Sequence, residues 1–304
     1  MKREHKILRH IDKNGLGIEI GPSHNPVAPK KEGYKVQIID HVSREELIKK
    51  YKDGPVFPEK IEEVDFVWNG RQSYSELTGT KYYYDWIIAS HMIEHTPDLI
   101  GFLNECDSIL KDDGVISLVV PDKRYCFDHY RPLTGISKII DCHLQRNTIT
   151  SPGTAAEFFL TYVSRDGNPS WDVKSNDGQF DFKYSLDEAI KNMNSIIYGG
   201  SYVDLHSWCF VPHSFRLIIH DLYSLGFIRF KEVDFFPTEG GCEFYITLSR
   251  TGKGIEKSRI EMLDEIEAEI SEGIVFSKEY RRSVEPKRTS FLSRILKQYR
   301  AVRS

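Results

Sequence analysis

Short apolar runs alternate with longer amphipathic stretches along the first part of the chain. Residues 86–89 and 115–121 are almost wholly apolar, which is typical of strands buried on both faces. Between them, residues 99–110 carry apolar side chains at helical spacing, and Pro97 suits a first helical turn whose amides are unpaired. An Asp-Asp-Gly turn at 112–114 ends this helix. Two buried strands joined through a helix form a βαβ unit, so the pattern predicts a parallel sheet.

Three earlier apolar runs extend the predicted sheet, at residues 16–21, 36–40 and 64–68. Gly21 ends the first run, and a glycine at that place lets the backbone approach a ligand without a Cβ in the way. Asp40 ends the second run, where an acid is suited to accept hydrogen bonds from ribose hydroxyls. As an alternative, Asp40 caps the helix that follows. Because ligands bind at the carboxyl edge of an open α/β sheet, these strand ends mark a candidate site.

The composition excludes several classes of protein. Charged residues make up 28% of the 304 residues and the net charge is −4, so we expect no nucleic-acid partner. The five cysteines are scattered and form no CxxC pair, which argues against a disulfide framework or a zinc site. The sequence contains no apolar signal core and no stretch suited to cross a membrane. We therefore expect a protein of the reducing cytoplasm.

A long polar and aromatic segment separates the strand at 115–121 from an amphipathic helix at 211–226. We interpret residues 123–209 as an insertion over the ligand edge, a substrate lid rather than a separate domain. Aromatic faces with nearby polar groups suit a carbohydrate, since sugars offer apolar C–H faces and many hydroxyls; the alternative is that the aromatic residues form the insertion's own core. The expected elements are helices at 136–144, 155–163 and 186–193 and a loop at 165–179. The aromatic residues include Tyr125, Phe127, His129, Tyr130, Phe158, Phe159, Tyr162, Trp171, Phe180, Phe182, Tyr184, Tyr198, Tyr202 and Trp208.

Five segments between Gly17 and Asp122 resemble, in order and spacing, the successive motifs of class I S-adenosylmethionine-dependent methyltransferases. They read GIEIG, IID, VDFVW, YDWIIASHMIEH and SILKDDGVISLVVPD. The resemblance implies an α/β fold with a Rossmann-like, mostly parallel sheet and an antiparallel last strand. It places the methyltransferase domain at residues 1–250. The sheet would end with the helix at 211–226 and strands at 227–233 and 243–248.

The resemblance also implies S-adenosyl-L-methionine as cofactor and a set of residues that hold it. The loop after the first strand would pass under the methionine part, and the acid ending the second strand would hold the ribose. The loop reads GPSHNP in place of GxGxG, and Pro22 and Pro26 speak against a dinucleotide-binding dehydrogenase. Asp65 and Phe66 would border the adenine, and the end of the strand at 86–89 would lie beside the sulfonium. The expected cofactor contacts are Glu19, Gly21, Pro22, Ser23, Asp40, Asp65, Phe66, Ala89, Ser90 and His91.

A sugar hydroxyl is a poor nucleophile near neutral pH, so its methylation needs a positioned base such as histidine. We expect His91 or His129 to be this base, with Glu94 orienting it and His95 shaping the site. For each histidine the alternative is a hydrogen-bonded structural role. We assign no metal ligands, although a divalent ion is an alternative because some sugar methyltransferases use one. Its ligands would be Asp122, Asp128 and His129. His206, where the insertion returns to the sheet edge, is a further candidate for the base.

Three later segments, PDKRYCFDHYRPLT, DLHSWCFVPHSF and GCEFY, resemble methyltransferase domains of bacterial polysaccharide gene clusters for O-antigen or capsule, some of which are fused to glycosyltransferases. The resemblance implies O-methylation of a sugar hydroxyl on a surface polysaccharide, nucleotide sugar or lipid-linked glycan. One alternative is a small-molecule or amine N-methyltransferase. Another is a cofactor-binding scaffold for a glycosyltransferase complex.

Residues 251–304 are expected to form a helical extension beyond the methyltransferase domain. An acidic amphipathic helix at 255–272 can pair with a partner. From Pro286 onward, apolar residues lie on one helical face and basic residues on the other, so this helix can lie on an anionic membrane surface or dock on a glycosyltransferase. The alternative is a frayed basic tail. We therefore expect a cytoplasmic protein with peripheral contact to the inner membrane, and the sequence sets no oligomeric state.

Overall fold

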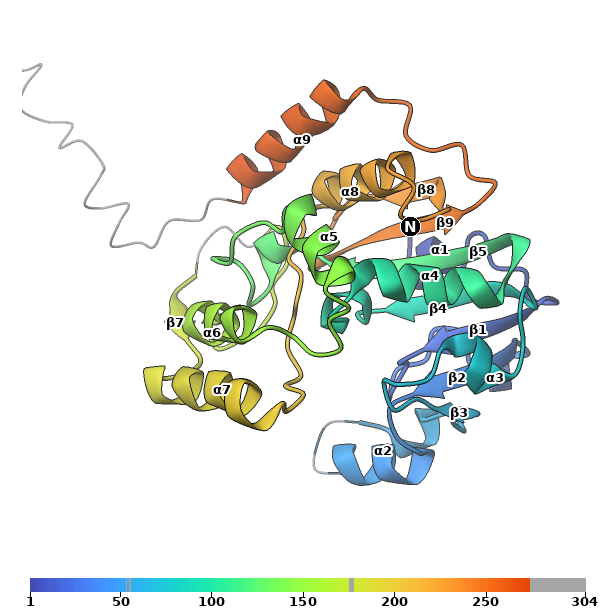
Figure 1. Cartoon of the computed structure of the whole chain (residues 1–304), viewed down its shortest axis with the longest axis horizontal. Helices are drawn as coiled ribbons and strands as arrows, with labels where there is room; N and C mark the ends of the chain where they lie inside the picture. Colours follow the sequence, from blue (N-terminus) through green and yellow to red (C-terminus); the bar gives the residue numbers. More distant parts are fainter. Residues whose placement is uncertain (53, 55, 175–177, 274–304) are drawn as a thin grey trace, which may run out of the picture.

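A mixed β-sheet forms the centre of the chain in the computed structural model, which describes residues 1–52, 54, 56–174 and 178–273 (Figure 1). Within those residues the sheet has seven strands in the order β3-β2-β1-β4-β5-β9-β8. Neighbouring strands from β3 to β5 pair in parallel, whereas β9 is antiparallel to both of its neighbours. This is the predicted Rossmann-like sheet, so the predicted fold class is confirmed. The strands are β1 (Leu16–Ile20), β2 (Lys35–Asp40), β3 (Phe66–Val67), β4 (Tyr84–Ser90), β5 (Leu110–Pro121), β8 (Lys231–Phe236) and β9 (Glu243–Ser249).

Two strand predictions were wrong in detail. The strand expected at 227–233 begins only at Lys231. The apolar residues Ile228 and Phe230, which suggested the earlier start, are buried in the main core without being part of the strand. The turn expected at 112–114 is a bulge within β5. Across it, the pairing with β4 passes from Leu110 opposite Tyr84 to Val115 opposite Trp86.

Helices and loops cover both faces of the sheet, and the side chains of β4 alternate between the two cores. Ile87 and Ala89 lie in the core formed with α3, α4 and α8, whereas Trp86 and Ile88 lie in the core closed by α1. Alternation is what a strand buried on both faces requires. The helices of the described residues are α1 (Arg3–Ile7), α2 (Arg44–Tyr51), α3 (Tyr74–Thr78), α4 (Leu99–Ile109), α5 (Ile136–Leu144), α6 (Pro152–Thr161), α7 (Leu186–Gly199), α8 (Pro212–Ser224) and α9 (Arg259–Glu272).

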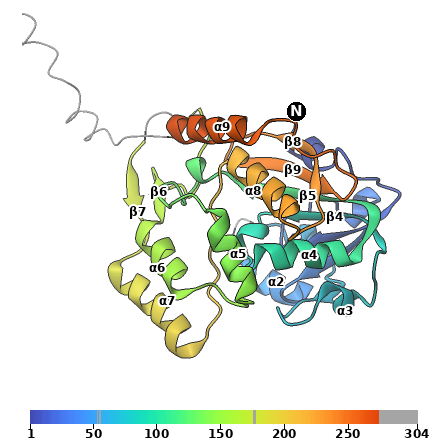
Figure 2. The same ribbon diagram turned by 45° about the horizontal axis from the view of Figure 1, so that its top comes forward.

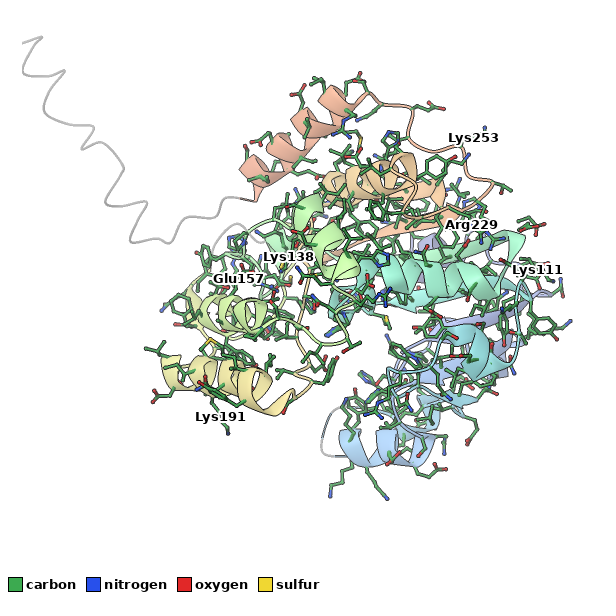
Figure 3. The ribbon with its side chains drawn as sticks, in the orientation of Figure 1. Lys111, Lys138, Glu157, Lys191, Arg229 and Lys253 are labelled. Atoms are coloured by element: carbon green, nitrogen blue, oxygen red, sulfur yellow. The ribbon has the colours of Figure 1, made fainter. Side chains whose placement is uncertain are left out.

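The insertion lies beyond the carboxyl ends of the central strands (Figures 1 and 2). Its helices α6 and α7 pack together, and two short strands, β6 (Val163–Arg165) and β7 (Phe180–Phe182), pair antiparallel. In Figure 3, Glu157 and Lys191 mark this part of the molecule, on the side opposite Lys111 near the start of β5. The position over the ligand edge agrees with the interpretation of a lid, whose boundaries stay a prediction.

The acidic helix α9 packs on α8 of the same chain. Met262 and Ile266 are buried against Val211 and Leu217, whereas Leu263 and Ile270 are exposed, so pairing of this helix with a partner stays a prediction. The basic helix predicted from Pro286 onward lies outside the described residues, and its partner and membrane roles stay predictions. No helix in the described part of the chain has the length and apolar character needed to span a bilayer.

Candidate functional site

The loop after β1 forms the first part of the candidate site. Gly21 (φ +64°) and Ser23 (φ +54°) both adopt the left-handed conformation that glycine tolerates best. A Cβ added to Gly21 would lie 3.4 Å from Met92 Cγ, an ordinary van der Waals distance, so the positive φ rather than a lack of space favours glycine here. The Gly21 amide donates to the Ile39 carbonyl (2.8 Å), and the Ser23 amide donates to Asp40 Oδ2 (2.9 Å). The loop is therefore fastened to the end of β2 with Asp40 beside it.

Glu19 serves this loop from inside the protein. It is buried, and its carboxylate accepts hydrogen bonds from the amides of Val27 (2.7 Å) and Ala28 (3.2 Å). Burial raises the pKa of Glu19 to about 7, although the two amide hydrogen bonds act in the opposite direction. Both carboxylate oxygens are thus occupied within the protein. Glu19 anchors the loop, and the geometry does not support the predicted direct contact with the cofactor.

Phe66 pairs with Ile39, next to the carboxyl end of β2, so its expected contact with the adenine stays a prediction, whereas the Asp65 carboxylate is engaged by Ile38 and Lys30 within the protein. Asp65 precedes β3, and its carboxylate accepts a hydrogen bond from the Ile38 amide (2.7 Å), which holds β3 against β2. The residue that follows β3 beside Asp40 is Trp68, whose amide donates to the Asp40 carbonyl (2.8 Å). Trp68 was not predicted as a site residue, because it was counted as the last residue of the strand at 64–68. The strand ends at Val67, so Trp68 is the first residue of the loop that follows it.

His91 follows the end of β4 in a strained left-handed conformation, with φ of +51°. Its Nε2 lies 2.6 Å from Glu243 Oε2, and its Nδ1 lies 3.5 Å from Glu94 Oε1. Although burial opposes protonation, the two carboxylates raise the pKa of His91 to about 9. A protonated imidazole cannot accept a proton, so the structure argues against His91 as the base. The neighbouring Ser90 is held by Arg3, which donates to its Oγ (2.9 Å).

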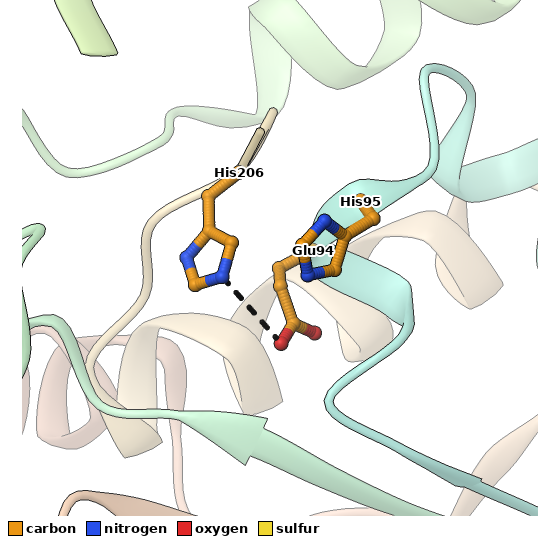
Figure 4. Close-up of side chains that lie close together, drawn as sticks. All are labelled: Glu94, His95 and His206. Atoms are coloured by element: carbon orange, nitrogen blue, oxygen red, sulfur yellow. Dashed lines mark ion pairs between the residues drawn. The ribbon is translucent and has the colours of Figure 1, made fainter. Parts of the chain in front are cut away.

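Glu94 lies at the centre of a buried polar cluster, which we call the Glu94 cluster and which also contains His95 and His206 (Figure 4). Glu94 is 0% exposed, and neither carboxylate oxygen has a hydrogen-bond partner among the described residues. His206 Nε2 lies 3.9 Å from Glu94 Oε1, and one nitrogen or oxygen atom of each residue lies within 4.8 Å of the others. The amide of Ser207 donates to the Glu94 carbonyl (2.6 Å). Folding of the insertion thus brings His206 to the end of β4.

Asp128 and Arg131 hold His206 in place. His206 Nδ1 lies 2.5 Å from Asp128 Oδ2, and Arg131 Nη1 donates to both Asp128 Oδ1 (2.8 Å) and the His206 carbonyl (2.8 Å). Burial alone would raise the pKa of Asp128, but His206 and Arg131 lower it to about 2. Asp128 is therefore an anion that orients the imidazole. No local sequence pattern indicated a role for Arg131, because its position depends on His206, which is distant in the sequence.

The ion site that we considered at Asp122, Asp128 and His129 does not form, because each residue is bonded elsewhere. Asp122 binds the Arg124 guanidinium through both carboxylate oxygens (2.6 and 3.0 Å). His129 Nδ1 lies 2.8 Å from the Arg124 carbonyl, and its ring stacks on Phe180 with centroids 4.9 Å apart. Burial lowers the pKa of His129 to about 4. His129 is therefore a neutral, weakly basic part of the insertion's core, and this geometry does not support it as the base.

A family model described as a methyltransferase domain matches residues 3–165, more than half of the chain. The chain belongs to the methyltransferase-domain family. The match spans all five strands from β1 to β5 and the beginning of the insertion. The family and the sheet order agree with the class I fold and the S-adenosyl-L-methionine cofactor that the sequence motifs predicted.

Solved structures with a similar fold share little sequence with this methyltransferase, and no curated protein matches it. The trans-methyltransferase CalH in complex with SAH is 14% identical, with a TM-score of 0.38 over 81% of this chain and 53% of CalH. The CurJ carbon methyltransferase is 11% identical, with a TM-score of 0.37 over 80% of this chain and 51% of the other. The CcbJ methyltransferase from Streptomyces caelestis is 9% identical, with a TM-score of 0.42 over 81% of this chain and 88% of CcbJ. The chain spans about half the length of the first two, and no functional conclusion rests on these likenesses.

The residues at the sheet edge fit the methyl donor of this family. Gly21 has no side chain to keep a ligand from its backbone. Ser23, which follows Pro22, adopts the left-handed conformation that a second glycine would adopt in a more glycine-rich loop. Asp40 Oδ1 binds both the amide (2.8 Å) and Nδ1 (2.6 Å) of His41, whereas Oδ2 accepts one hydrogen bond, from the Ser23 amide, so Oδ2 keeps a lone pair for a ribose hydroxyl. The buried Ala89 keeps the end of β4 small. These individual contacts with the cofactor stay predictions.

Proposed function

We propose that this methyltransferase transfers a methyl group to a sugar hydroxyl, in the assembly of a bacterial surface polysaccharide. The observation that carries the proposal is the Glu94 cluster, which lies just after β4, where the methyl donor is expected. Two imidazoles and a carboxylate in one buried place can take or polarise an O–H proton, and a sugar hydroxyl needs this assistance. A neutral amine does not. The polysaccharide setting rests on the resemblance of the segments at 121–134, 204–215 and 241–245.

The insertion supports the sugar-binding expectation only in part. Phe127 and Tyr162 stack on each other at 4.4 Å and pack with Phe158, so these aromatic residues form the insertion's own core, the alternative raised from the sequence. Tyr202 is different, since it is 57% exposed and its hydroxyl lies 3.3 Å from Asp204, the neighbour of His95. We therefore place the sugar ring against Tyr202, beside the Glu94 cluster.

Within this proposal the Glu94 cluster, rather than His91 or His129, handles the hydroxyl proton. His91 is protonated between two carboxylates, and His129 is committed to the core of the insertion. His91 keeps a positioning role, because its ion pair with Glu243 connects the end of β4 to β9. That connection shapes the wall between the methyl donor and the acceptor.

Label transfer from methyl-labelled S-adenosylmethionine to matched acceptors tests this function. The acceptors are nucleotide sugars and oligosaccharides, with amino sugars and simple amines as comparison. We expect label in alkali-stable methyl ethers of the sugars. Glu94→Gln should lower turnover by about 100-fold or more, since acid–base assistance contributes about 10²–10⁴-fold, while affinity for S-adenosylhomocysteine stays unchanged. His129→Gln, a buried histidine outside the cluster, is the control and should remain active.

The alternatives raised from the sequence give different results in the same assay. Label in amines alone would replace the proposal with an N-methyltransferase. Cofactor binding without transfer to any acceptor would favour the scaffold for a glycosyltransferase complex. Full activity of Glu94→Gln on sugars would remove the Glu94 cluster from the chemistry.

A further inference from the structure

The environment of the Glu94 carboxylate calls for a ligand that the protein itself does not provide. An ionised carboxylate without hydrogen bonds is costly to bury, so buried carboxylates are paired or bind metals. Glu94 is fully buried, and neither oxygen accepts a hydrogen bond from the described residues. The imidazole nitrogens facing it are His91 Nδ1 at 3.5 Å, in a long ion pair, and His206 Nε2 at 3.9 Å, both beyond the length of a hydrogen bond to a charged group. The carboxylate therefore faces a site that an additional cation would complete.

His206 is held as a metal-ligating histidine usually is. Its Nδ1 faces the anionic Asp128 at 2.5 Å, which leaves Nε2 directed toward Glu94 (Figure 4). A carboxylate on the other ring nitrogen fixes the tautomer and raises the basicity of the free nitrogen, an arrangement that recurs around metal ions. Arg131 in turn holds Asp128 from the opposite side. The imidazole is thus oriented before any ligand arrives.

His95 completes the set with a carboxylate of its own. Its Nδ1 lies 2.8 Å from Asp204 Oδ1, although the direction of approach is not that of a hydrogen bond. The ring meets that of His206 edge to face, with centroids 4.8 Å apart. Two histidines, each beside an acid, thus converge on the carboxylate of Glu94, which accepts no hydrogen bond from the described residues (Figure 4).

We propose that Glu94, His95 and His206 bind one divalent transition-metal ion such as Zn²⁺, Co²⁺ or Mn²⁺. The residue spacing had not singled out this set, and we had assigned no metal ligands from the sequence. Imidazole favours transition metals over Mg²⁺, and two histidines with one carboxylate leave coordination positions open. The ligand atoms lie within 4.8 Å of one another, so small side-chain movements would bring all three to the bond lengths of about 2.0–2.2 Å that such ions take.

The role of the ion in catalysis rests on the proposed function, whereas its binding does not. A metal-bound hydroxyl loses its proton more readily, because the ion stabilises the resulting oxygen anion. With its three side chains bound to the ion, the Glu94 cluster would act on the hydroxyl through the ion instead of accepting the proton itself. In the transfer the acceptor would release its proton to water, its oxygen would form the new C–O bond, and the C–S bond would break. The electron pair of that bond returns to sulfur, which leaves as the neutral thioether. The protein's part is to hold the ion beside His91, where the methyl donor is expected.

Metal titration of the full-length protein, stripped with a chelator, tests the site without any substrate. We expect one Co²⁺ to bind per chain, with visible absorption bands shifted from those of Co²⁺ in water by the nitrogen ligands. The affinities measured by calorimetry should fall in the order Zn²⁺, Co²⁺, Mn²⁺, Mg²⁺. Glu94→Gln and His206→Gln should each weaken Co²⁺ binding by about 100-fold, and Asp128→Asn by about 10- to 100-fold through the orientation of His206. His129→Gln is the matched control and should bind Co²⁺ like the wild type.

The wild-type spectrum keeps the proposal testable even where a variant fails to fold. Absence of stoichiometric binding of Zn²⁺, Co²⁺ or Mn²⁺ to the folded wild type would overturn it. Equal Co²⁺ affinity in folded Glu94→Gln, checked by circular dichroism, would also overturn it. Sugar methylation that survives complete metal removal would refute the catalytic role alone. Stoichiometric metal without any sugar methylation would instead refute the proposed function and leave the metal site standing.

Discussion

Replacement of Asp40 by asparagine tests the cofactor edge most directly. Asp40 is 3% exposed, and its two oxygens accept hydrogen bonds from the amides of Ser23 (2.9 Å) and His41 (2.8 Å). In the expected complex the same carboxylate also accepts the ribose hydroxyls. Asparagine keeps the size of the side chain but replaces one oxygen by a donor group. The charge and one acceptor are therefore lost.

The expected loss of affinity follows from the strength of hydrogen bonds to charged groups. Such a bond contributes about 1.5–3 kcal/mol, which corresponds to a change in Kd of about 10- to 150-fold. We expect Asp40→Asn to weaken binding of S-adenosylhomocysteine by this factor. The replacement also disturbs an amide partner inside the protein, at a cost of about 1–3 kcal/mol in the free energy of unfolding. A control must separate the two effects.

Asp65→Asn is the matched control, because it makes the same chemical change on the neighbouring strand. Its carboxylate accepts a hydrogen bond from the Ile38 amide (2.7 Å) and forms an ion pair with Lys30 Nζ (2.8 Å), so its partners lie within the protein. We expect a similar loss in the free energy of unfolding and an unchanged Kd. Isothermal titration with S-adenosylhomocysteine and urea unfolding measure both quantities for both variants.

Two results would count against this reasoning. If Asp40→Asn binds S-adenosylhomocysteine like the wild type, Asp40 does not hold the ribose. If Asp65→Asn loses as much affinity, the measured effect comes from damage to the β2–β3 edge rather than from a lost cofactor contact.

Three further predictions concern stability. Gly17→Ala should lower the free energy of unfolding by about 3 kcal/mol or more, because a Cβ there would overlap the buried indole ring of Trp86; a loss below 1 kcal/mol in urea unfolding would contradict the packing. The pKa of Glu19 rises from 4.5 to about 7 on folding, so its contribution to stability is full below pH 4.5 and declines by up to about 3 kcal/mol as pH rises through 7. Glu19→Gln should therefore make the urea midpoint less dependent on pH between pH 5 and 8. A pH dependence equal to that of the wild type would exclude this titration. Asp107→Asn should cost about 3 kcal/mol in thermal unfolding, because it removes the ion pairs of Asp107 with Arg229 and with the largely buried Arg250 (2.6 Å), which keeps only the exposed Asp112 as an ion-pair partner among the described residues; a Tm like that of the wild type would disprove this.

The predictions from sequence succeeded where a local pattern has a single physical cause. The apolar runs of β1, β2, β4 and β5 could only be buried strands joined by crossovers, and their order along the chain predicted the sheet. Patterns with two possible causes were less reliable. Ile228 and Phe230 are apolar because they pack under α8, and not because they pair in a strand. Asp65 was expected beside the adenine from the family resemblance, and apolarity alone could not show that its carboxylate binds Ile38 and Lys30.

The site illustrates the same limit for polar residues. His91, Glu94 and His95 were found because they follow a strand, but their roles depend on residues that are remote in sequence. Glu243 on β9 makes His91 a cation, and this pairing exists only once β9 has inserted between β5 and β8. A histidine's protonation depends on such neighbours, so no local pattern could have assigned the base.

The sequence by itself determined the fold class, the family motifs and the cofactor edge. These features arise from residues close together in the chain, through strand periodicity and the ends of consecutive strands. Only the tertiary structure decided which side chains meet at the Glu94 cluster. His206 comes from the return of the insertion and is oriented by Asp128 from its beginning, so its position depends on how the whole insertion packs. Packing across that distance brings two imidazoles to one buried carboxylate.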